Sequence, residues 1–362
     1  MPQRTLLLYA ASEANSTFSY QQAWPRAFQR DPRFSCTAVN LAGRDLATRL
    51  GRGWQANTFR GDLVVLLHSA FSNACMVPDW MVATLGRLSR PKVFFIGNEY
   101  KLMPEKMAFS DAVGVTLLVS QSQSADVHAM YRARLGCAVA GIPNTGLDPE
   151  RFRPERADSE RPIDLGYRAD DSPPYLGHRE RREMAEFFQA RAAAYGLTVD
   201  ISLDPRDRFD ETAWAAFLNR CKGQLGTEAG GDYFDLDDRS RHEVNAYTAD
   251  HPGASFEEIR ARFFDHYPNP VPLRILSGRN VEAAGTKTAQ LLFDGHYDGF
   301  FVADQHYIAL RKDFSNADDA LAKFRDDEFR HRISEQAYDL VCQEFTYQRL
   351  MDRVHDAVKG LN

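Results

Sequence analysis

The sequence is poor in cysteine and has no long apolar run. Its 362 residues include five cysteines, which are widely spaced and form no CxxC pair. This pattern argues against a disulfide-stapled scaffold and a cysteine-based zinc cluster, and it is typical of a reducing compartment. No apolar run approaches the roughly 18 residues that a membrane-spanning helix needs, and the run at residues 6–11 is too short for a signal peptide. We therefore expect a cytoplasmic protein with no integral membrane segment.

An excess of basic residues is also missing. The chain has 44 lysines and arginines against 50 aspartates and glutamates, which gives a formal net charge of −6. A negative balance disfavours non-specific binding to nucleic acid or anionic lipid. We expect no nucleic-acid partner, and any polyanion would need a local basic patch.

Several common catalytic and cofactor-binding motifs are absent. Ala10-Ala11-Ser12-Glu13 follows the first predicted strand in place of GxGxxG, which argues against a nicotinamide-dependent dehydrogenase. The segment ending in Gly285-Thr286-Lys287 misses the phosphate-loop spacing by one residue. Neither HExxH nor GxSxG occurs, and the ten histidines form no ligand pattern. The pair Asp235 and Asp237 forms a DxD string, which is either a metal-binding motif or a solvated loop. We predict no metal site and no bound cofactor.

The sequence does contain alternating short apolar runs and amphipathic stretches. In the first half, continuous apolar runs at 62–68, 92–96 and 115–120 are typical of parallel strands covered on both faces, with helical patterns between them. A proline-rich and glycine-containing stretch at 143–154 then marks a domain boundary, after which the alternation resumes. The pattern predicts an α/β protein made of two doubly wound domains.

Polar residues follow several predicted strands, where ligands of such sheets bind. His68 follows the strand at 62–68 and Glu99 the strand at 92–96, so both are candidate site residues. The alternatives are a histidine that caps a neighbouring helix and a solvated loop acid. Arg168 follows the strand at 163–167 and either binds phosphate oxygens or pairs with Asp170 or Asp171 at the surface.

A glycine-containing loop followed by a helix start occupies residues 277–288. Backbone amides and the helix dipole at such a position attract phosphate. We therefore expect Ser277 and Arg279 to lie beside a bound phosphate, and we count Glu282 and Thr286 of the same stretch as further candidate residues for binding a nucleotide sugar.

Three motifs together resemble the GT-B-fold glycosyltransferases. Residues 142–148 read IPNTGLD and are followed by Phe152-Arg153-Pro154, which is similar to the interdomain linker of that family. The strings GTEAGG at 226–231 and NVEAAGTKT at 280–288 resemble the two glutamate segments of its retaining members, and residues 280–301 resemble the CgeB-type group. The sequence departs from the family in the spacing of the two glutamates, because Arg274 stands eight residues before Glu282 where the family has a glutamate.

The resemblance implies two Rossmann-like doubly wound domains facing across a cleft, with a carboxy-terminal helix that crosses back to the first domain. The expected domains are an acceptor-side domain at 1–148, a nucleotide-sugar-binding domain at 149–345 and the returning helix at 346–362.

The resemblance also assigns roles to individual residues. It implies that Glu282 binds the ribose of a nucleotide sugar, that Arg168 neutralises its diphosphate and that Glu228 contacts the donor sugar. His68 and Glu99 would lie on the acceptor side as candidate bases. The lysine that normally assists the diphosphate arginine is not evident, and His178 or Arg181 is a possible substitute.

The sequence therefore predicts a hexosyltransferase-like enzyme. It would move a sugar from a nucleoside diphosphate donor, with UDP as the expected nucleotide, to a glycan, lipid-linked or protein hydroxyl. The expected reaction is metal-independent, retaining and part of cell-surface glycan biosynthesis. Two alternatives stay open: a nucleotide-sugar epimerase on the same fold, and a sugar-nucleotide-binding module without turnover.

Overall fold

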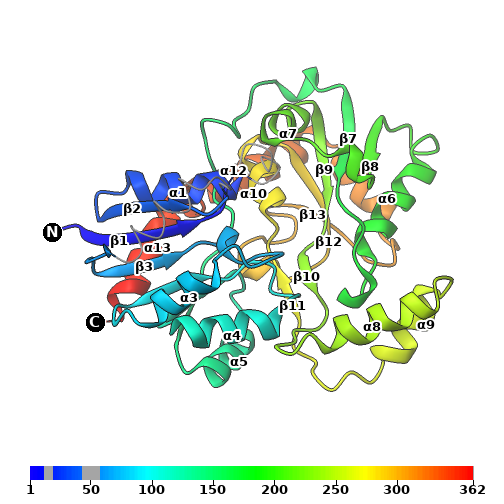
Figure 1. The fold of residues 1–362 in the computed structure, drawn as a ribbon. Helices are drawn as coiled ribbons and strands as arrows, with labels where there is room; N and C mark the ends of the chain where they lie inside the picture. The colour runs from blue at the N-terminus through cyan, green and yellow to red at the C-terminus, as the bar shows by residue number, and fades with distance from the viewer. Residues whose placement is uncertain (12–18, 43–57, 362) are drawn as a thin grey trace. The chain divides into compact units, whose positions relative to one another are not determined.

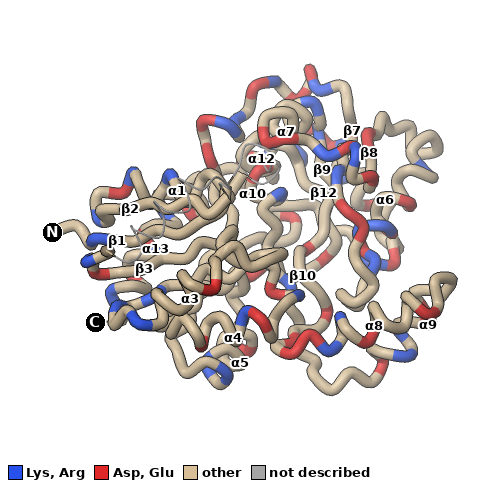
Figure 2. Tube along the Cα trace, viewed as in Figure 1, with Lys and Arg blue, Asp and Glu red and all other residues tan. Residues whose placement is uncertain are grey.

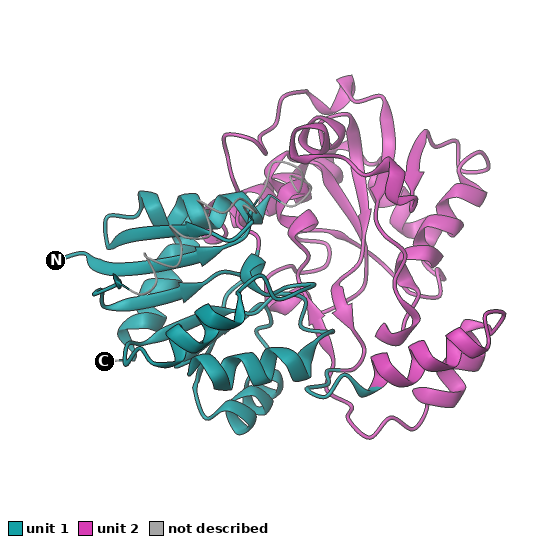
Figure 3. Ribbon diagram, viewed as in Figure 1, with its two compact units in different colours: residues 1–144, 234–239, 347–362 teal, residues 145–233, 240–346 magenta. Residues whose placement is uncertain are grey.

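The structure is a computed structural model that describes residues 1–11, 19–42 and 58–361. The chain divides into two compact units (Figure 3). Unit 1 contains residues 1–144, 234–239 and 347–362, and unit 2 contains residues 145–233 and 240–346. The chain therefore leaves unit 2 briefly at 234–239 and returns to unit 1 for its last helix.

Unit 1 is built on a six-stranded parallel sheet with the order β2-β1-β3-β4-β5-β6 (Figure 1). Its central strands are the continuous apolar runs of the sequence, as expected for strands covered on both faces. β2 is more polar because it lies at the edge of the sheet and is only partly buried, which is why the apolar pattern does not reveal it. The strands are β1 (Gln3–Tyr9), β2 (Phe34–Asn40), β3 (Leu63–Leu66), β4 (Lys92–Phe95), β5 (Leu117–Ser120) and β6 (Ala138–Gly141).

Helices cover both faces of the first sheet. Successive side chains of a strand point to opposite faces, so Phe95 packs on Trp24 of α1 while Phe94 packs on Phe109 of α4. The last helix, α13, lies beside α1 and adds Leu350 and Val354 to the same core. The helices of unit 1 are α1 (Tyr20–Arg30), the short 3-10 turn η2 (His68–Ala70), α3 (Asp79–Gly86), α4 (Met103–Val113), α5 (Ala125–Leu135) and α13 (Tyr347–Lys359).

Unit 2 contains a five-stranded parallel sheet with the order β13-β12-β9-β7-β8 and a separate antiparallel pair, β10 and β11. Leu165, Leu225 and Leu291 form a core with α6 and α11 on one face, whereas Leu292 joins Val281 and Val341 on the other. The strands are β7 (Ile163–Arg168), β8 (Val199–Ser202), β9 (Cys221–Gly226), β10 (Ala229–Gly231), β11 (Leu273–Ile275), β12 (Ala289–Phe293) and β13 (Ile308–Leu310).

The polar stretch between β10 and β11 forms two of the helices of unit 2. These are α8 and α9, whose small separate core contains Val244, Ile259 and Phe264. None of the helices in the described part of the chain is both long and apolar enough to cross a bilayer. The helices are α6 (Glu180–Arg191), α7 (Glu211–Leu218), α8 (Arg239–Asp250), α9 (Phe256–Phe263), α10 (Gly278–Gly285), α11 (Ala317–Arg325) and α12 (Asp327–Glu344).

Charged residues of both signs are interspersed along the described trace. Figure 2 shows lysines and arginines alternating with aspartates and glutamates over both units, rather than collecting in one long basic tract. Any site for an anion must therefore depend on a few local cations.

Candidate functional site

A pocket opens in unit 2 at the carboxyl ends of β7 and β9. The chain places β8 on one side of β7 and then β9 on the other side. The strand order therefore reverses between β7 and β9. Ligands of doubly wound sheets bind in the crevice at such a switch point. The empty space in and in front of the pocket is about 310 Å³, open solvent at its mouth included. It is lined by Tyr167, Arg181, Gln224, Leu225, Gly226, Thr227, Glu228, Ser277, Arg279 and Asn280.

The first turn of α10 forms one wall of this pocket. Ser277 precedes the helix, and its backbone N–H donates to Oδ1 of Asn280 at 3.2 Å. Asn280 is fixed in turn, because its Nδ2 donates to Oε1 of Gln290 on β12 at 2.9 Å. A Cβ on Gly278 would lie 2.4 Å from Oγ1 of Thr145, so only glycine lets the helix begin this close to the linker. The free amides of this turn therefore point to a fixed place and favour an anion there.

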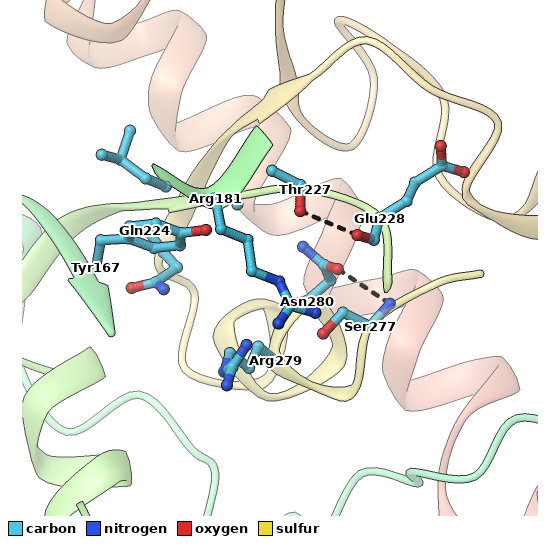
Figure 4. A pocket seen from close by; sticks show the side chains of 10 residues that line it. Tyr167, Arg181, Gln224, Thr227, Glu228, Ser277, Arg279 and Asn280 are labelled. Atoms are coloured by element: carbon cyan, nitrogen blue, oxygen red, sulfur yellow. Dashed lines mark hydrogen bonds between the residues drawn. The ribbon is translucent and has the colours of Figure 1, made fainter. Parts of the chain in front are cut away.

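Two arginines from different helices converge on the pocket. Arg181 comes from α6 and Arg279 from α10, and Figure 4 shows the Arg181 side chain extending toward Arg279 and Asn280. Neither guanidinium forms an ion pair with a carboxylate of the described residues; Arg181 only donates a 3.4 Å hydrogen bond to the carbonyl of Asp170. Burial, and then repulsion by Arg181, lower the pKa of Arg279. An anion bound between the two arginines would relieve that repulsion.

Glu228 is the one carboxylate among the lining residues. Its Oε1 accepts a 2.7 Å hydrogen bond from the backbone N–H of Tyr297. Burial raises its pKa. Figure 4 shows its carboxylate turned away from Arg279. The pocket thus has a cationic side, formed by Arg181 and Arg279, and another side on which Glu228 is the single acid.

A buried ion-pair network holds the elements around the pocket. The Arg274 guanidinium on β11 donates to both oxygens of Glu180 at 2.9 Å, and it also pairs with Asp232. Lys312 contacts Glu180 at 2.7 Å. Burial alone would raise the pKa of Glu180, but Arg274, His178 and Lys312 outweigh it and bring the pKa to about 2. Because Glu180 begins α6, this network fixes the helix that carries Arg181.

Of the two residues expected to replace the missing lysine, the structure brings only Arg181 to the pocket. His178 is buried, and its Nε2 lies 3.1 Å from the carbonyl of Gly230. Burial lowers its pKa to about 4. His178 therefore contacts the backbone of β10.

Arg168 does not lie where the resemblance implies. Its guanidinium contacts Asp200 on β8 at 2.5 Å and packs on the rings of Phe209 and Phe217. The alternative of a surface pair with Asp170 or Asp171 is also wrong, because those acids pair with Arg208 and Arg182. The side chain leaves β7 toward its neighbour strand, so it does not line the pocket.

Glu282 lies on α10 and Thr286 directly after it, and both are outside the pocket lining. One oxygen of Glu282 accepts a 2.8 Å hydrogen bond from the indole of Trp214. Thr286 follows the end of the helix, about 12 Å from its start by helix rise. Its hydroxyl is fully buried against the carbonyl of Ala283. The expected contact of Thr286 with a nucleotide sugar therefore does not fit, because it lies at the opposite end of the helix.

His68 follows β3 in unit 1, near the point where the order of the first sheet reverses. Its ring is enclosed by the aromatic rings of Tyr20, Trp24 and Phe95 at 5.3–6.0 Å between centroids. Neither ring nitrogen has a hydrogen-bond partner among the described residues, and burial lowers the pKa to about 3. Neither expectation for His68, a helix-capping role or a ready proton acceptor, matches this apolar enclosure.

Glu99 is not a solvated loop acid. It is buried and accepts three hydrogen bonds of 2.7 Å, from the hydroxyls of Ser120 and Tyr131 and from the backbone N–H of Gln121. Burial raises its pKa. These partners lie on β5, directly after it and on α5, so Glu99 ties the loop after β4 to β5 and α5.

Lys106 is a buried residue that the sequence pattern does not reveal. Its ammonium group donates to the carbonyls of Gly97, Asn98 and Lys101 at 2.6–2.9 Å, and these three acceptors match its three protons. Burial lowers its pKa to about 7. A single side chain of α4 thus stabilises the loop at 97–101, which follows β4.

The DxD string lies in the segment 234–239, which packs with unit 1. Its anchor is the preceding residue, Phe234, whose ring meets that of Tyr131 edge-on at 5.2 Å. Within residues 1–11, 19–42 and 58–361, no three histidine, cysteine, aspartate or glutamate side chains come together as a metal site.

Comparison with protein-family models finds no match, and neither does comparison with curated protein sequences. Solved structures do match. HepE from Anabaena, in complex with UDP-glucose, superposes with a TM-score of 0.52 at 11% identity and covers 99% of this chain and 100% of its own. Sucrose-phosphate synthase from Thermosynechococcus elongatus gives 0.54 at 10% identity, with 99% of each chain covered. A glycosyltransferase from Rickettsia africae gives 0.51 at 10% identity, covering 99% and 98%.

These similarities extend over nearly the whole chain, and they agree with two doubly wound parallel sheets and a returning carboxy-terminal helix. At such low identity they establish the fold and leave the reaction open. The chain has the GT-B fold of these glycosyltransferases, which confirms the fold expected from its linker and glutamate motifs.

Proposed function

We propose that this protein is a glycosyltransferase that takes a sugar from a nucleoside diphosphate donor and passes it to an acceptor hydroxyl. The observation that carries the proposal is the pair Arg181 and Arg279 at the switch point of unit 2, beside the first turn of α10. Two arginines without carboxylate partners among the described residues are suited to a diphosphate. The solved HepE complexes, whose ligands are UDP-glucose or UDP, make UDP the first nucleotide to test.

In this proposal the two arginines act on the leaving group. Negative charge grows on the diphosphate as the bond to the sugar breaks, and fixed donors aimed at that charge lower the barrier by a few kcal/mol each. Because the arginines supply positive charge, we propose a reaction that needs no divalent ion. Glu228, fixed by the Tyr297 amide, lies on the side of the pocket where the donor sugar would extend.

We further propose that the reaction retains the anomeric configuration. An inverting enzyme needs a base to deprotonate the acceptor. Burial leaves His68 with a pKa of about 3, and both Glu99 oxygens already accept hydrogen bonds. Neither candidate is suited to take the proton, so the leaving phosphate is the better acceptor for it.

The remaining details rest on the sequence resemblance. They are a hexosyl donor, a glycan, lipid-linked or protein acceptor, and a role in cell-surface glycan biosynthesis in the cytoplasm. An epimerase is less well supported, because it needs acids on both faces of the sugar and Glu228 is the single carboxylate among the lining residues.

Titration calorimetry with UDP tests the donor site. Arg279→Ala and Arg181→Ala should each weaken binding about ten- to a hundredfold, as expected for a lost charged hydrogen bond worth roughly 1.5–3 kcal/mol. Arg182→Ala is the matched control, since Arg182 is on the same helix but pairs at the surface with Asp171 and Glu186. If all three variants bind UDP as the unchanged protein does, the donor pocket is wrongly assigned.

Slow hydrolysis of a UDP-sugar, with water as the acceptor, tests the reaction. Early NMR spectra should show the sugar released with the anomeric configuration of the donor, at a rate that EDTA does not change. The opposite anomer would contradict retention, and an epimerised donor would favour the epimerase. Nucleotide binding without turnover on any acceptor tried would favour a binding module.

A further inference from the structure

Unit 2 has a second pocket, at the other end of α10. The empty space in and in front of it is about 460 Å³, open solvent at its mouth included. Residues before β7, after α10 and in the first half of α12 form it. They are Pro154, Arg156, Ala157, Asp158, Arg161, Lys287, Arg330, His331, Ser334 and Glu335.

The lining is rich in cations. It contains three arginines and one lysine against two carboxylates, although the whole chain has a net charge of −6. The two carboxylates are already neutralised, because Asp158 pairs with Arg330 and Glu335 contacts Lys287 at 2.7 Å. Two guanidinium groups, those of Arg156 and Arg161, remain in excess.

Arg161 is a buried cation without a carboxylate partner. It is 3% exposed, and its Nη atoms donate to the carbonyls of Cys221 and Thr286 and to the hydroxyl of Thr288 at 2.8–2.9 Å. Its Nε has no hydrogen-bond partner within the described chain. Burial lowers the pKa of Arg161, and the nearby charge of Asp158 only partly offsets that effect. A buried positive charge whose hydrogen bonds all go to neutral groups is costly, and a bound anion would stabilise it.

Arg156 is an exposed arginine that could contact such an anion from the rim of the pocket. It is exposed at the rim, and its guanidinium makes no ion pair with any described residue. Arginine presents a planar fork of donors that matches phosphate oxygens. A phosphate group near neutral pH carries close to two negative charges, which equals the number of cations in excess.

We propose that this second pocket binds a small phosphate-bearing anion. Arg156 contacts the phosphate oxygens directly, and Arg161 stabilises them through its buried charge. The site is separate from the donor pocket and does not depend on the proposed reaction. It lies at the opposite end of α10 and of β9 from the donor pocket. Arg161 donates a hydrogen bond to the carbonyl of Cys221, the first residue of β9, whereas Gly226, the last residue of β9, lines the donor pocket.

The test uses inorganic phosphate and the full chain carrying Arg279→Ala, which removes one of the two arginines expected to hold phosphate in the donor pocket. Calorimetry at constant ionic strength should show binding in this background. Adding Arg156→Gln should weaken it about threefold to tenfold, and Arg156→Glu by more than tenfold. Arg153→Glu is the matched control, because Arg153 is exposed in the same segment and faces Glu155 at 3.6 Å.

Three results would overturn the proposal. The first is no phosphate binding at millimolar concentration by either the unchanged protein or the Arg279→Ala chain. The second is equal weakening by Arg156→Glu and Arg153→Glu, which would mean a general charge effect. The third is complete loss of binding with Arg279→Ala alone, which would place the phosphate in the donor pocket. Both exposed arginines can be replaced without disturbing the core, so the variants should fold.

Discussion

At the scale of single residues, three of the buried ionisable side chains of unit 1 have very different surroundings. Glu99 is compensated by three donors and Lys106 by three backbone carbonyls. His68 has no polar partner among the described residues and is surrounded by rings. Buried polar groups without hydrogen bonds destabilise a fold, so His68 is the residue whose replacement is most informative.

His68 should make the stability of the fold sensitive to acid. Its pKa is about 3 when folded and near 6.5 when unfolded. Between these values the unfolded chain binds a proton that the folded chain does not, so stability present above pH 6.5 is lost as the pH falls toward 3. From pH 7 to pH 4 we expect the unchanged protein to lose about 3 kcal/mol relative to His68→Phe.

Urea unfolding of both proteins at several pH values measures this difference. His331→Phe is the control, because it is the same replacement at an exposed histidine of unit 2. Parallel profiles for the unchanged protein and His68→Phe would show that His68 is not held neutral in the folded state.

At the scale of elements, the short β10–β11 pair shapes the loop that carries Glu228. Gly230 of β10 has φ of +91°, a conformation that other residues avoid. A Cβ at this position would lie 1.8 Å from the carbonyl oxygen of Leu273 on β11. The two strands can pair at this distance only because position 230 is glycine.

Gly230→Ala should therefore separate the two strands and displace Glu228. We expect a loss of about 3 kcal/mol or more in the free energy of unfolding, from backbone strain and steric overlap together. Gly253→Ala, where a Cβ meets nothing within 4 Å, should change stability by less than about 0.5 kcal/mol. Thermal unfolding of the two variants gives the comparison, and equal melting temperatures would refute the role of Gly230.

At the scale of the whole molecule, the chain ends in the unit where it began. α13 places Leu350, Met351, Val354 and Val358 in the core of unit 1, whereas α12 packs in unit 2. Unit 1 therefore depends on residues from both ends of the chain, and it cannot complete its core until the last helix is present.

Val354→Asp should weaken unit 1 selectively. Val354 is 1% exposed in this core, and an unpaired carboxylate there should cost about 3 kcal/mol or more. Hydrogen exchange should show lost protection in β1 and β3 and retained protection in β9 and β12, since domains with their own cores open separately. Lys359→Asp, at an exposed position of the same helix, is the control. Equal loss of protection in both units would contradict this division.

The fold could be inferred from the sequence to a large extent. The continuous apolar runs at 62–68, 92–96 and 115–120 are β3, β4 and β5, and α3 and α4 occupy the helical patterns expected between them. Periodicity is reliable here because the strands are buried on both faces and the helices are amphipathic. The edge strand β2 was not predicted, because a partly exposed strand can contain polar residues and then has no continuous apolar run.

The candidate site was predictable only in part. Glu228, Ser277 and Arg279 line the pocket, but Arg168 turns to Asp200, and Glu282 bonds Trp214. The position of a residue after a strand shows that it lies near the ligand end of the sheet, and it does not show which way its side chain turns. Arg181 is one of several arginines at the start of α6, and only the tertiary contacts of that helix select it.

The sequence by itself determined the two doubly wound sheets, since local periodicity and the linker motif are written in consecutive residues. The tertiary structure alone decided which cations stay without acids and which acids are buried and satisfied. The physical reason is that charge compensation depends on distances between residues far apart in the chain, such as Arg274 with Glu180 or Arg330 with Asp158. Those pairings leave Arg181, Arg279 and Arg156 available for anions.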